Sequence, residues 1–208
     1  MLLNNYSSLY KATIISVFTA IIIAGFSFII GKENLLLLLN KNLGKFGDFF
    51  FNYATYIGDG IVWALFGIYF LIFERKRLPL ILLTILISTI FVHTIKGHLI
   101  VPNFRPIEVF ASMLNQVHTI NGVEVHYGGS FPSGHTTQAF SMYLLFCLFS
   151  SKKWMILVGY FLAILVGYSR VYQAQHFPID VAGGIIVAII SVLISLQIVK
   201  KFQKNNYS

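Results

Sequence analysis

Long hydrophobic stretches recur along the chain, and shorter polar segments separate them. A helix that crosses the hydrocarbon core of a bilayer needs about 20 mostly apolar residues. Six stretches approach that length when the small polar residues at their ends are counted with them. We therefore expect an all-α integral membrane protein with six transmembrane helices, at residues 12–30, 61–73, 78–95, 136–150, 154–168 and 181–199.

The composition supports a membrane protein. Hydrophobic residues make up 57% of the 208 positions, charged residues make up 11%, and the mean hydropathy is +0.77. A typical soluble domain carries about 25% charged residues. A cleaved signal peptide is the alternative for the first stretch, because Lys11 precedes it, but residues 31–34 do not form a small-residue cleavage site. We expect one membrane-embedded domain over residues 1–208, with the motifs at about 78–199.

The charged residues divide unevenly between the two sides that six spans define. The side that carries both termini has nine Lys and Arg residues against Glu74 alone, whereas the other side has six against six acids. The formal net charge of +8 therefore lies entirely on one side. Because Lys and Arg beside spans favour the cytoplasm, both termini are expected there. The excess of basic residues is thus explained by the membrane topology, and we expect no nucleic-acid partner.

A long connection after the third predicted span ends in a polar motif. Residues 96–131 are rich in turn-forming residues, and a loop of this length is usually functional or disordered. The sequence FPSGH at 131–135 then leads into the fourth span. If Ser133 caps that helix, the first-turn amides form an anion site beside the His135 imidazole. Taken alone, Ser133 and Gly134 also fit an ordinary helix start.

Residues 169–180, which connect the fifth and sixth spans on the same side, form a second polar cluster. Arg170 can hold phosphate oxygens through its rigid fork of donors. His176 and Asp180 are four residues apart, so the carboxylate can reach the imidazole if the sixth helix begins near Pro178. It would then fix the tautomer and leave the other ring nitrogen free to attack. By itself, Asp180 also fits a simple helix cap.

The two clusters resemble the signature of the type 2 phosphatidic acid phosphatase family, whose active site is related to that of the vanadium haloperoxidases. The family pattern is a Lys, six residues, Arg-Pro, then Pro-Ser-Gly-His, then Ser-Arg, five residues, His, three residues, Asp. The resemblance extends from about the third span to the sixth, and the N-terminal third carries no motif. It implies an acid phosphatase/haloperoxidase-like helical bundle. The matching positions are Arg105-Pro106, residues 132–135, Ser169-Arg170, His176 and Asp180.

The resemblance also implies a role for each matched residue. His176 would be the nucleophile that becomes phosphorylated, Asp180 would orient it, and His135 would protonate the leaving group. The implied activity is hydrolysis of the phosphate monoester or diphosphate of a lipid, on the non-cytoplasmic face of a membrane that we take to be the bacterial inner membrane. The residues implied to hold the phosphoryl oxygens are Lys96, Arg105, Ser133, Gly134 and Arg170.

We expect no metal or other cofactor. Two histidines and an aspartate could bind zinc, but several cations in the same site would repel a divalent ion. The reaction is therefore expected to be metal-independent.

The sequence departs from the family pattern at the lysine. Eight residues separate Lys96 from Arg105 where the family has six, and the position with the family spacing is His98. Either Lys96 keeps the role across a longer loop, or His98 replaces it. We favour Lys96, because a permanent cation suits phosphate better than an imidazole that is mostly neutral at pH 7.

The substrate stays open among several phosphorylated lipids. Phosphatidic acid, phosphatidylglycerol phosphate, undecaprenyl diphosphate and lipid A phosphate all carry a phosphoryl group at headgroup level. A phosphotransferase of the same family is one alternative. A transporter or binder of phosphorylated lipid is the alternative from another class, but the charges lie at span ends and the halves do not repeat. No pattern indicates the oligomeric state.

The remaining segments carry weaker signals. Residues 35–59 are partly amphipathic, with aromatic residues from Phe46 to Tyr53 at near-helical spacing. An interfacial helix beside the site and a connector with aromatic anchors fit this pattern equally. Outside the motifs, we interpret His93 as buried or interhelical, and His118 and His126 as loop residues.

Overall fold

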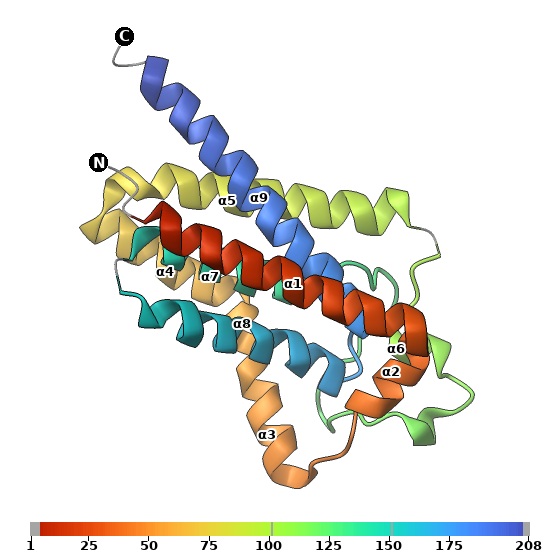
Figure 1. Cartoon of the computed structure of the whole chain (residues 1–208). Coiled ribbons are helices and arrows are strands. Elements are labelled where there is room, and N and C mark those ends of the chain that lie inside the picture. Colours follow the sequence, from red (N-terminus) through yellow and green to blue (C-terminus); the bar gives the residue numbers. More distant parts are fainter. Residues whose placement is uncertain (1–4, 101, 151, 206–208) are drawn as a thin grey trace.

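The computed structural model describes residues 5–100, 102–150 and 152–205, and every regular element in them is helical (Figure 1). Hydrophobic runs account for the long helices, and Asn5, whose side chain accepts a hydrogen bond from the Ser8 amide at 3.0 Å, caps the first of them. The elements in chain order are α1 (Tyr6–Ile30), α2 (Lys32–Leu39), α3 (Gly44–Ala54), η1 (Thr55–Gly58), α4 (Gly60–Phe73), η2 (Arg75–Arg77), α5 (Leu78–Thr94), η3 (Ile95–Leu99), α6 (Pro106–Val109), η4 (Leu114–Gln116), α7 (Gly134–Phe149), α8 (Trp154–Tyr172) and α9 (Pro178–Asn205).

Four of the six predicted spans are confirmed as helices that are long and apolar enough to cross a membrane. They are α1, α5 with its flanking turns, α8 and α9. The predicted second span, α4, has 14 residues and reaches a span length only with α3 and η1, from which it bends by 46°. The predicted fourth span, α7, has 16 residues. Its length of about 24 Å falls short of a core about 30 Å thick, so exactly six spans is not established.

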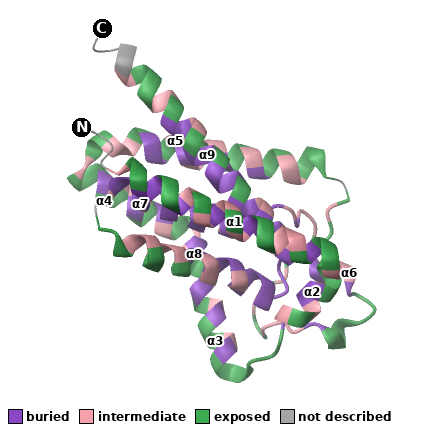
Figure 2. Cartoon of the chain, viewed as in Figure 1, coloured by how far each residue is buried: buried purple, intermediate pink, exposed green. Residues whose placement is uncertain are grey.

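α7 forms the centre of the bundle. It lies against α1, α5, α8 and α9, and most of its residues are buried, as the purple ribbon in Figure 2 shows. A helix that is buried on all sides needs no apolar stripe, and its small and hydroxyl-bearing residues let neighbours approach closely. The first turn of α7 is therefore held rigidly at one end of the bundle.

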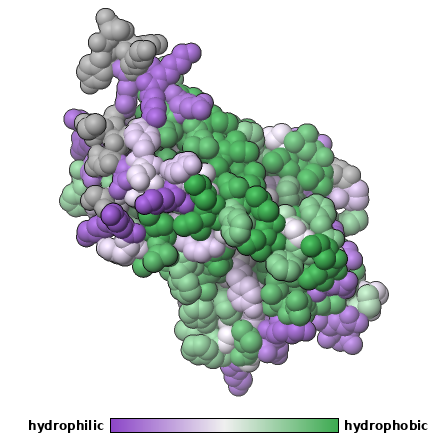
Figure 3. All heavy atoms as spheres, in the orientation of Figure 1, coloured by the Kyte–Doolittle hydropathy of each residue, from purple (hydrophilic) through white to green (hydrophobic). Residues whose placement is uncertain are grey.

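Hydrophobic atoms cover the middle of the molecule, and hydrophilic atoms gather at its two ends (Figure 3). One end carries the start of α1, the η2 turn and the last part of α9, and the opposite end carries α2, α3 and α6 (Figure 1). This distribution is that of an integral membrane protein.

α3 projects from the end of the molecule that holds α2 and α6, where it packs on the last part of α8 (Figure 1). Its inner face buries Phe51 against Tyr168 and Tyr172, with ring centroids 5.0 and 4.6 Å away. Phe46 and Phe49 on the outer face are 80% and 64% exposed. The amphipathic helix predicted in this region is thus present, and its contact with a membrane surface stays a prediction.

We predict that the close contact between α9 and α7 at Gly184 does not tolerate a larger side chain. A Cβ atom at this position would lie 2.7 Å from the Ser133 carbonyl oxygen and 3.0 Å from the Thr136 Cβ. The Ser133 backbone can move out of the way of an added methyl group only by shifting the start of α7. Gly184→Ala should therefore destabilise the protein by about 1–3 kcal/mol. The measurement is thermal unfolding in detergent. Gly25→Ala in α1, where a Cβ would meet nothing within 4 Å, is the matched control and should not unfold earlier. Equal midpoints for the two variants would contradict the prediction.

Candidate active site

The first turn of α7 begins at Ser133, as the sequence predicts. Its hydroxyl oxygen accepts hydrogen bonds from the Thr136 amide at 3.4 Å and the Thr136 hydroxyl at 2.9 Å, and the residue is fully buried. The amides of the first turn, including that of Gly134, have no acceptor inside the helix. The positive end of the helix dipole therefore faces the same space as these donors.

The first turn of α9 meets that of α7 through Asp180. The Asp180 carbonyl oxygen accepts a hydrogen bond from the Ser133 amide at 2.9 Å. One carboxylate oxygen, Oδ2, accepts from the Ser130 hydroxyl and from the Phe177 amide at 2.8 Å. Asp180 thus joins the two helix starts and the loop before α7 at one buried point.

His176 lies next to this carboxylate. Its Nδ1 atom is 3.4 Å from Asp180 Oδ2, which is close enough for an ion pair but longer than a well-formed charge-assisted hydrogen bond. The same oxygen already accepts from Ser130 and Phe177, so Nδ1 has no hydrogen-bond partner in the described part of the chain. The carboxylate therefore lies near one ring nitrogen, as predicted, but at a distance longer than a hydrogen bond to a charged group. The other ring nitrogen, Nε2, is the one that remains to act as the nucleophile.

Burial and positive charge both keep the His176 imidazole neutral. The side chain is 2% exposed. Burial is the largest cause that holds the pKa of His176 well below its ordinary range, and the charges of Arg105, Arg170 and Lys96 act in the same direction. At pH 7 the ring is consequently unprotonated, which is the form that can act as a nucleophile.

Arg105 reaches the site from the long loop. Its Nε donates to the Gly128 carbonyl at 2.8 Å and its Nη1 donates to the Gln175 carbonyl at 2.9 Å, one residue before His176. Glu108 fixes the base of this arrangement, because its Oε2 accepts from the amides of Arg105 and Gly128 at 2.8 and 2.7 Å. The loop is thereby folded into an ordered wall of the site.

Arg170 enters from the last turn of α8. Its Nη1 donates to the Thr55 hydroxyl at 2.8 Å and to the Gln173 side-chain oxygen at 3.1 Å. The side chain is buried, and its Nε has no hydrogen-bond partner among the described residues. Part of the guanidinium therefore remains available to an anion.

Two pockets flank the first turn of α7. One, of about 370 Å³, is lined by His135, Arg170 and Gln175 together with residues of η1 and of the long loop. The other, of about 220 Å³, is lined by Lys96, Gly134 and Thr137. His176 and the seven other residues predicted for the site thus lie together at this end of the bundle, although their chemical roles stay predictions.

Sequence reasoning missed the residues that hold the site in place. Ser130, Glu108, Gln175, Thr55 and Gln173 make the contacts described above, and of these only Ser130 and Gln175 adjoin a motif. Of the two interpretations of His93, buried or interhelical, burial is wrong because the residue is exposed, whereas it does line the Lys96 pocket between α5 and α7. No group of three His, Cys, Asp or Glu side chains suited to a metal occurs in the described residues, and the metal-independent reaction stays a prediction.

Comparisons with known proteins point to one superfamily. The chain matches the PAP2 superfamily over residues 78–204. It is 31% identical to a Sulfolobus acidocaldarius undecaprenyl-diphosphatase, over 68% of this chain and 65% of that protein. It is 39% identical to a Bacillus licheniformis bacitracin transport permease protein BcrC, over 44% of this chain and 41% of that protein. The match spans less than two thirds of the length of either relative. The crystal structure of Aquifex aeolicus LpxE is similar with a TM-score of 0.67 and 31% identity, over 78% of this chain and 93% of that chain.

We predict that inorganic phosphate stabilises the protein through this site. At a hundredfold excess over the dissociation constant, a ligand of the folded state raises the free energy of unfolding by about 2.7 kcal/mol. Phosphate should therefore raise the thermal midpoint of the wild type, and Arg105→Gln should lose most of that increase. Arg75→Gln removes an exposed arginine at the opposite end of the bundle and should keep it. An equal phosphate effect in the wild type and both variants would contradict an anion site at Arg105.

Proposed function

The chain belongs to the PAP2 superfamily, and on that premise we propose that it hydrolyses a lipid phosphate or diphosphate through a phosphohistidine on His176. The observation that carries the proposal is the buried His176 imidazole, 3.4 Å from the Asp180 carboxylate and surrounded by positive charge. A neutral imidazole in such a place is a nucleophile directed at an anion.

The reaction proceeds in two steps. His135 takes up a proton when the anionic phosphoryl group binds; His176 Nε2 then attacks phosphorus, the P–N bond forms, and the P–O bond to the lipid breaks while His135 gives that proton to the departing oxygen. Water then attacks the phosphorus of the phosphohistidine while His135 accepts its proton; the new P–O bond forms, the P–N bond to His176 breaks, and inorganic phosphate leaves. Asp180 stabilises the positive charge that develops on the imidazole during attack.

Cations and helix amides stabilise the charge on the phosphoryl group. Phosphoryl transfer depends chiefly on positioning and electrostatics, so the protein must supply donors around three equatorial oxygens. Arg105 and Arg170 flank His176, Lys96 lies on the side of Gly134, and the Ser133–Gly134 turn supplies amides. This set balances a dianion without a metal, which is why we propose a metal-independent reaction.

Hydrolysis explains the site better than transport does. The BcrC relative is named a transport permease, but the match covers only 44% of this chain. A transporter that moves a phosphorylated lipid unchanged needs the cations alone. It has no use for a buried His176–Asp180 pair or for His135 in the pocket that Arg170 also lines.

We propose that α4 and α7 also cross the membrane, which completes six spans. The position of α7 inside the bundle supports its inclusion, because its neighbours α5, α8 and α9 are spans by length. The basic η2 turn and the last part of α9 lie at one end of the bundle, and the site lies at the other. The positive-inside rule then favours both termini in the cytoplasm and the site on the non-cytoplasmic face, and we propose the bacterial inner membrane as the location.

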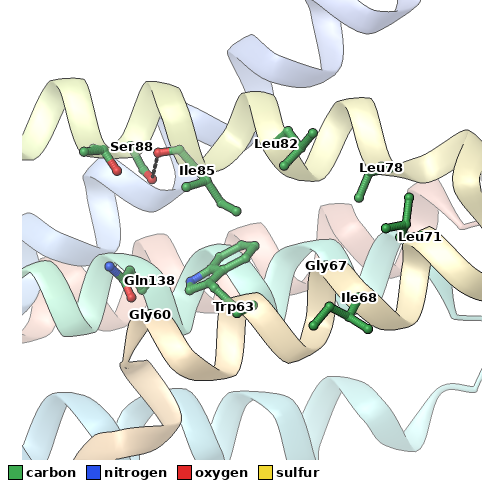
Figure 4. A pocket seen from close by; sticks show the side chains of 12 residues that line it. Gly60, Trp63, Gly67, Ile68, Leu71, Leu78, Leu82, Ile85, Ser88 and Gln138 are labelled. Atoms are coloured by element: carbon green, nitrogen blue, oxygen red, sulfur yellow. Dashed lines mark hydrogen bonds between the residues drawn. The ribbon is translucent and has the colours of Figure 1, made fainter.

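The lipid chain has a suitable place beside the site. An apolar pocket of about 490 Å³ lies between α4 and α5, and Trp63, Ile85 and Leu82 face it (Figure 4). It shares Ser88, Thr89 and Gln138 with the Lys96 pocket, so the two pockets are neighbours. A phosphoryl group near Lys96 would leave the hydrocarbon of the same molecule in this groove.

Undecaprenyl diphosphate is the substrate class that we favour, because the relative matched over 68% of this chain is an undecaprenyl-diphosphatase. A long isoprenoid suits a groove that is mainly apolar along its length. Phosphatidic acid, phosphatidylglycerol phosphate and lipid A phosphate present the same phosphoryl group and form the rest of the test panel. Transfer of the phosphoryl group to an acceptor other than water is the alternative outcome.

We expect phosphate release from a lipid diphosphate by the purified protein in detergent with EDTA present. His176→Ala should lower the rate at least about 10³-fold, since no other group replaces the nucleophile. The assay measures inorganic phosphate, and the thermal midpoint of the variant checks its folding. Release that EDTA abolishes would contradict the metal-independent mechanism, and full activity of His176→Ala would contradict the assigned nucleophile.

We expect Lys96, and not His98, to act as the phosphate-binding cation of α5 and η3. Lys96 is half-buried, its side chain lies against Gly129, and it shares a pocket with Gly134, whereas His98 is exposed. Lys96→Ala should therefore reduce kcat/KM by about 10²-fold, and His98→Ala by less than about threefold. The two variants form a matched pair in one assay. A larger loss in His98→Ala would reverse the assignment.

A further inference from the structure

One of the hydrogen-bond acceptors of the Arg170 side chain belongs to an N-terminal segment that contains no sequence motif. Thr55 begins η1, and its hydroxyl accepts a hydrogen bond from Arg170 Nη1 at 2.8 Å, across 115 positions of the chain. Thr55 is 6% exposed. The Gln173 side-chain oxygen accepts from the same Nη1 at 3.1 Å. Both acceptors lie outside the signature residues, and Thr55 also lies outside the 78–204 match.

These two acceptors fix the plane of the guanidinium. An arginine carries five N–H donors in a rigid planar fork, so holding one nitrogen determines where the others point. The Nη1 atom is engaged with Thr55 and Gln173, while Nε is buried and has no partner among the described residues. Arg170 itself lines the pocket that His135 also lines, so the orientation of its guanidinium decides which donors reach that pocket.

Thr55 is itself held in position by tight packing of its helix turn. The Gln173 side-chain nitrogen donates to the Phe51 carbonyl at 2.8 Å, which joins the end of α3 to the end of α8. At the other end of η1, a Cβ added to Gly58 would lie 2.7 Å from the His135 carbonyl oxygen. The η1 turn thus lies directly against the backbone of His135 as well as against Arg170.

A second set of hydrogen bonds ties the same segment to the last turn of α8. One Asp48 carboxylate oxygen accepts from the Tyr172 hydroxyl and contacts His118 Nε2, both at 2.7 Å. The Asn40 side chain donates to the carbonyls of Val171 and Tyr172 at 3.0 and 2.7 Å. Residues 40–58 therefore form a brace, a name that we use below for this segment, along the turn that carries Arg170.

We propose that Thr55, together with Gln173, is a positioning residue that orients the Arg170 guanidinium toward the phosphoryl group, and that the brace is thereby part of the phosphate site. This proposal rests on the proposed function, because it takes the anion bound at Arg170 to be a phosphoryl group. Thr55 does not touch the phosphate in this account; it acts through Arg170.

The test separates the hydroxyl of Thr55 from its bulk. Thr55→Val keeps the volume and removes the acceptor, whereas Thr55→Ser keeps the acceptor and removes the methyl group. Binding of inorganic phosphate to the purified full-length protein is measured by isothermal titration. We expect Thr55→Val to weaken binding about tenfold and Thr55→Ser to stay within about twofold of wild type. Thr84→Val, which removes a buried hydroxyl bonded to the Leu80 carbonyl in α5, is the matched control and should bind as wild type.

A double-mutant cycle with Arg170→Lys provides a readout that packing alone would not change. In the lysine background Thr55 has no guanidinium to orient, so Thr55→Val should have less than about a twofold effect. Equal weakening in both backgrounds would overturn the proposal, as would wild-type binding by Thr55→Val or weakened binding by Thr55→Ser. If the lysine background binds too weakly to measure, the comparison of Val with Ser decides. If Thr55→Val does not fold, Thr55→Ala takes its place.

The outcome is distinguishable from failure of the proposed function. Phosphate binding that depends on the Thr55 hydroxyl in a protein that hydrolyses no lipid phosphate would sustain the positioning role and refute the enzyme activity. If the protein hydrolyses a lipid phosphate but Thr55→Val binds phosphate as tightly as the wild type, the enzyme activity stands and the positioning role of Thr55 is refuted.

Discussion

The contact between the first turns of α7 and α9 is the constraint on which the rest of the site depends. The Asp180 carbonyl receives the Ser133 amide, and the Asp180 carboxylate receives the Ser130 hydroxyl and the Phe177 amide while it lies 3.4 Å from His176. One residue thus positions a helix dipole, a nucleophile and the loop before α7. The arrangement is buried, where electrostatic interactions are stronger than in water and where an unpaired polar group is costly.

Rigidity at this junction explains the construction of the bundle around it. α7 is buried by four neighbours, and Gly184 lets the α9 backbone approach the Ser133 carbonyl. The long loop contributes Arg105, which is fixed by Glu108 and Gly128, and the N-terminal brace contributes Thr55. Cations that would repel one another are therefore held together by the protein, so that an anionic ligand can be bound by a preformed site.

The sequence predicts those features that depend on local spacing. Ser133 as a helix cap follows from its place before an apolar run, and the approach of Asp180 to His176 follows from their spacing of four. Thr55 could not be assigned in the same way, because its contact with Arg170 depends on how the N-terminal segment packs on α8 across more than a hundred residues, whereas Gln173 lies only three residues after Arg170. The predicted number of six spans stays a prediction, because α4 and α7 are apolar but neither is long enough alone. Residues 101 and 151, inside the two predicted connections, lie outside the described part of the chain.

The central claim is that the phosphoryl group passes through His176, and the most direct measurement is to trap it there. Wild-type protein would be mixed with a lipid diphosphate labelled in its terminal phosphate, stopped within milliseconds in alkali, and analysed by peptide mass spectrometry. The account predicts a labelled adduct on His176 that survives alkali, is lost in acid, and decays at the rate of phosphate release. Turnover without any label on His176, or a label on another residue that decays at the turnover rate, would contradict it.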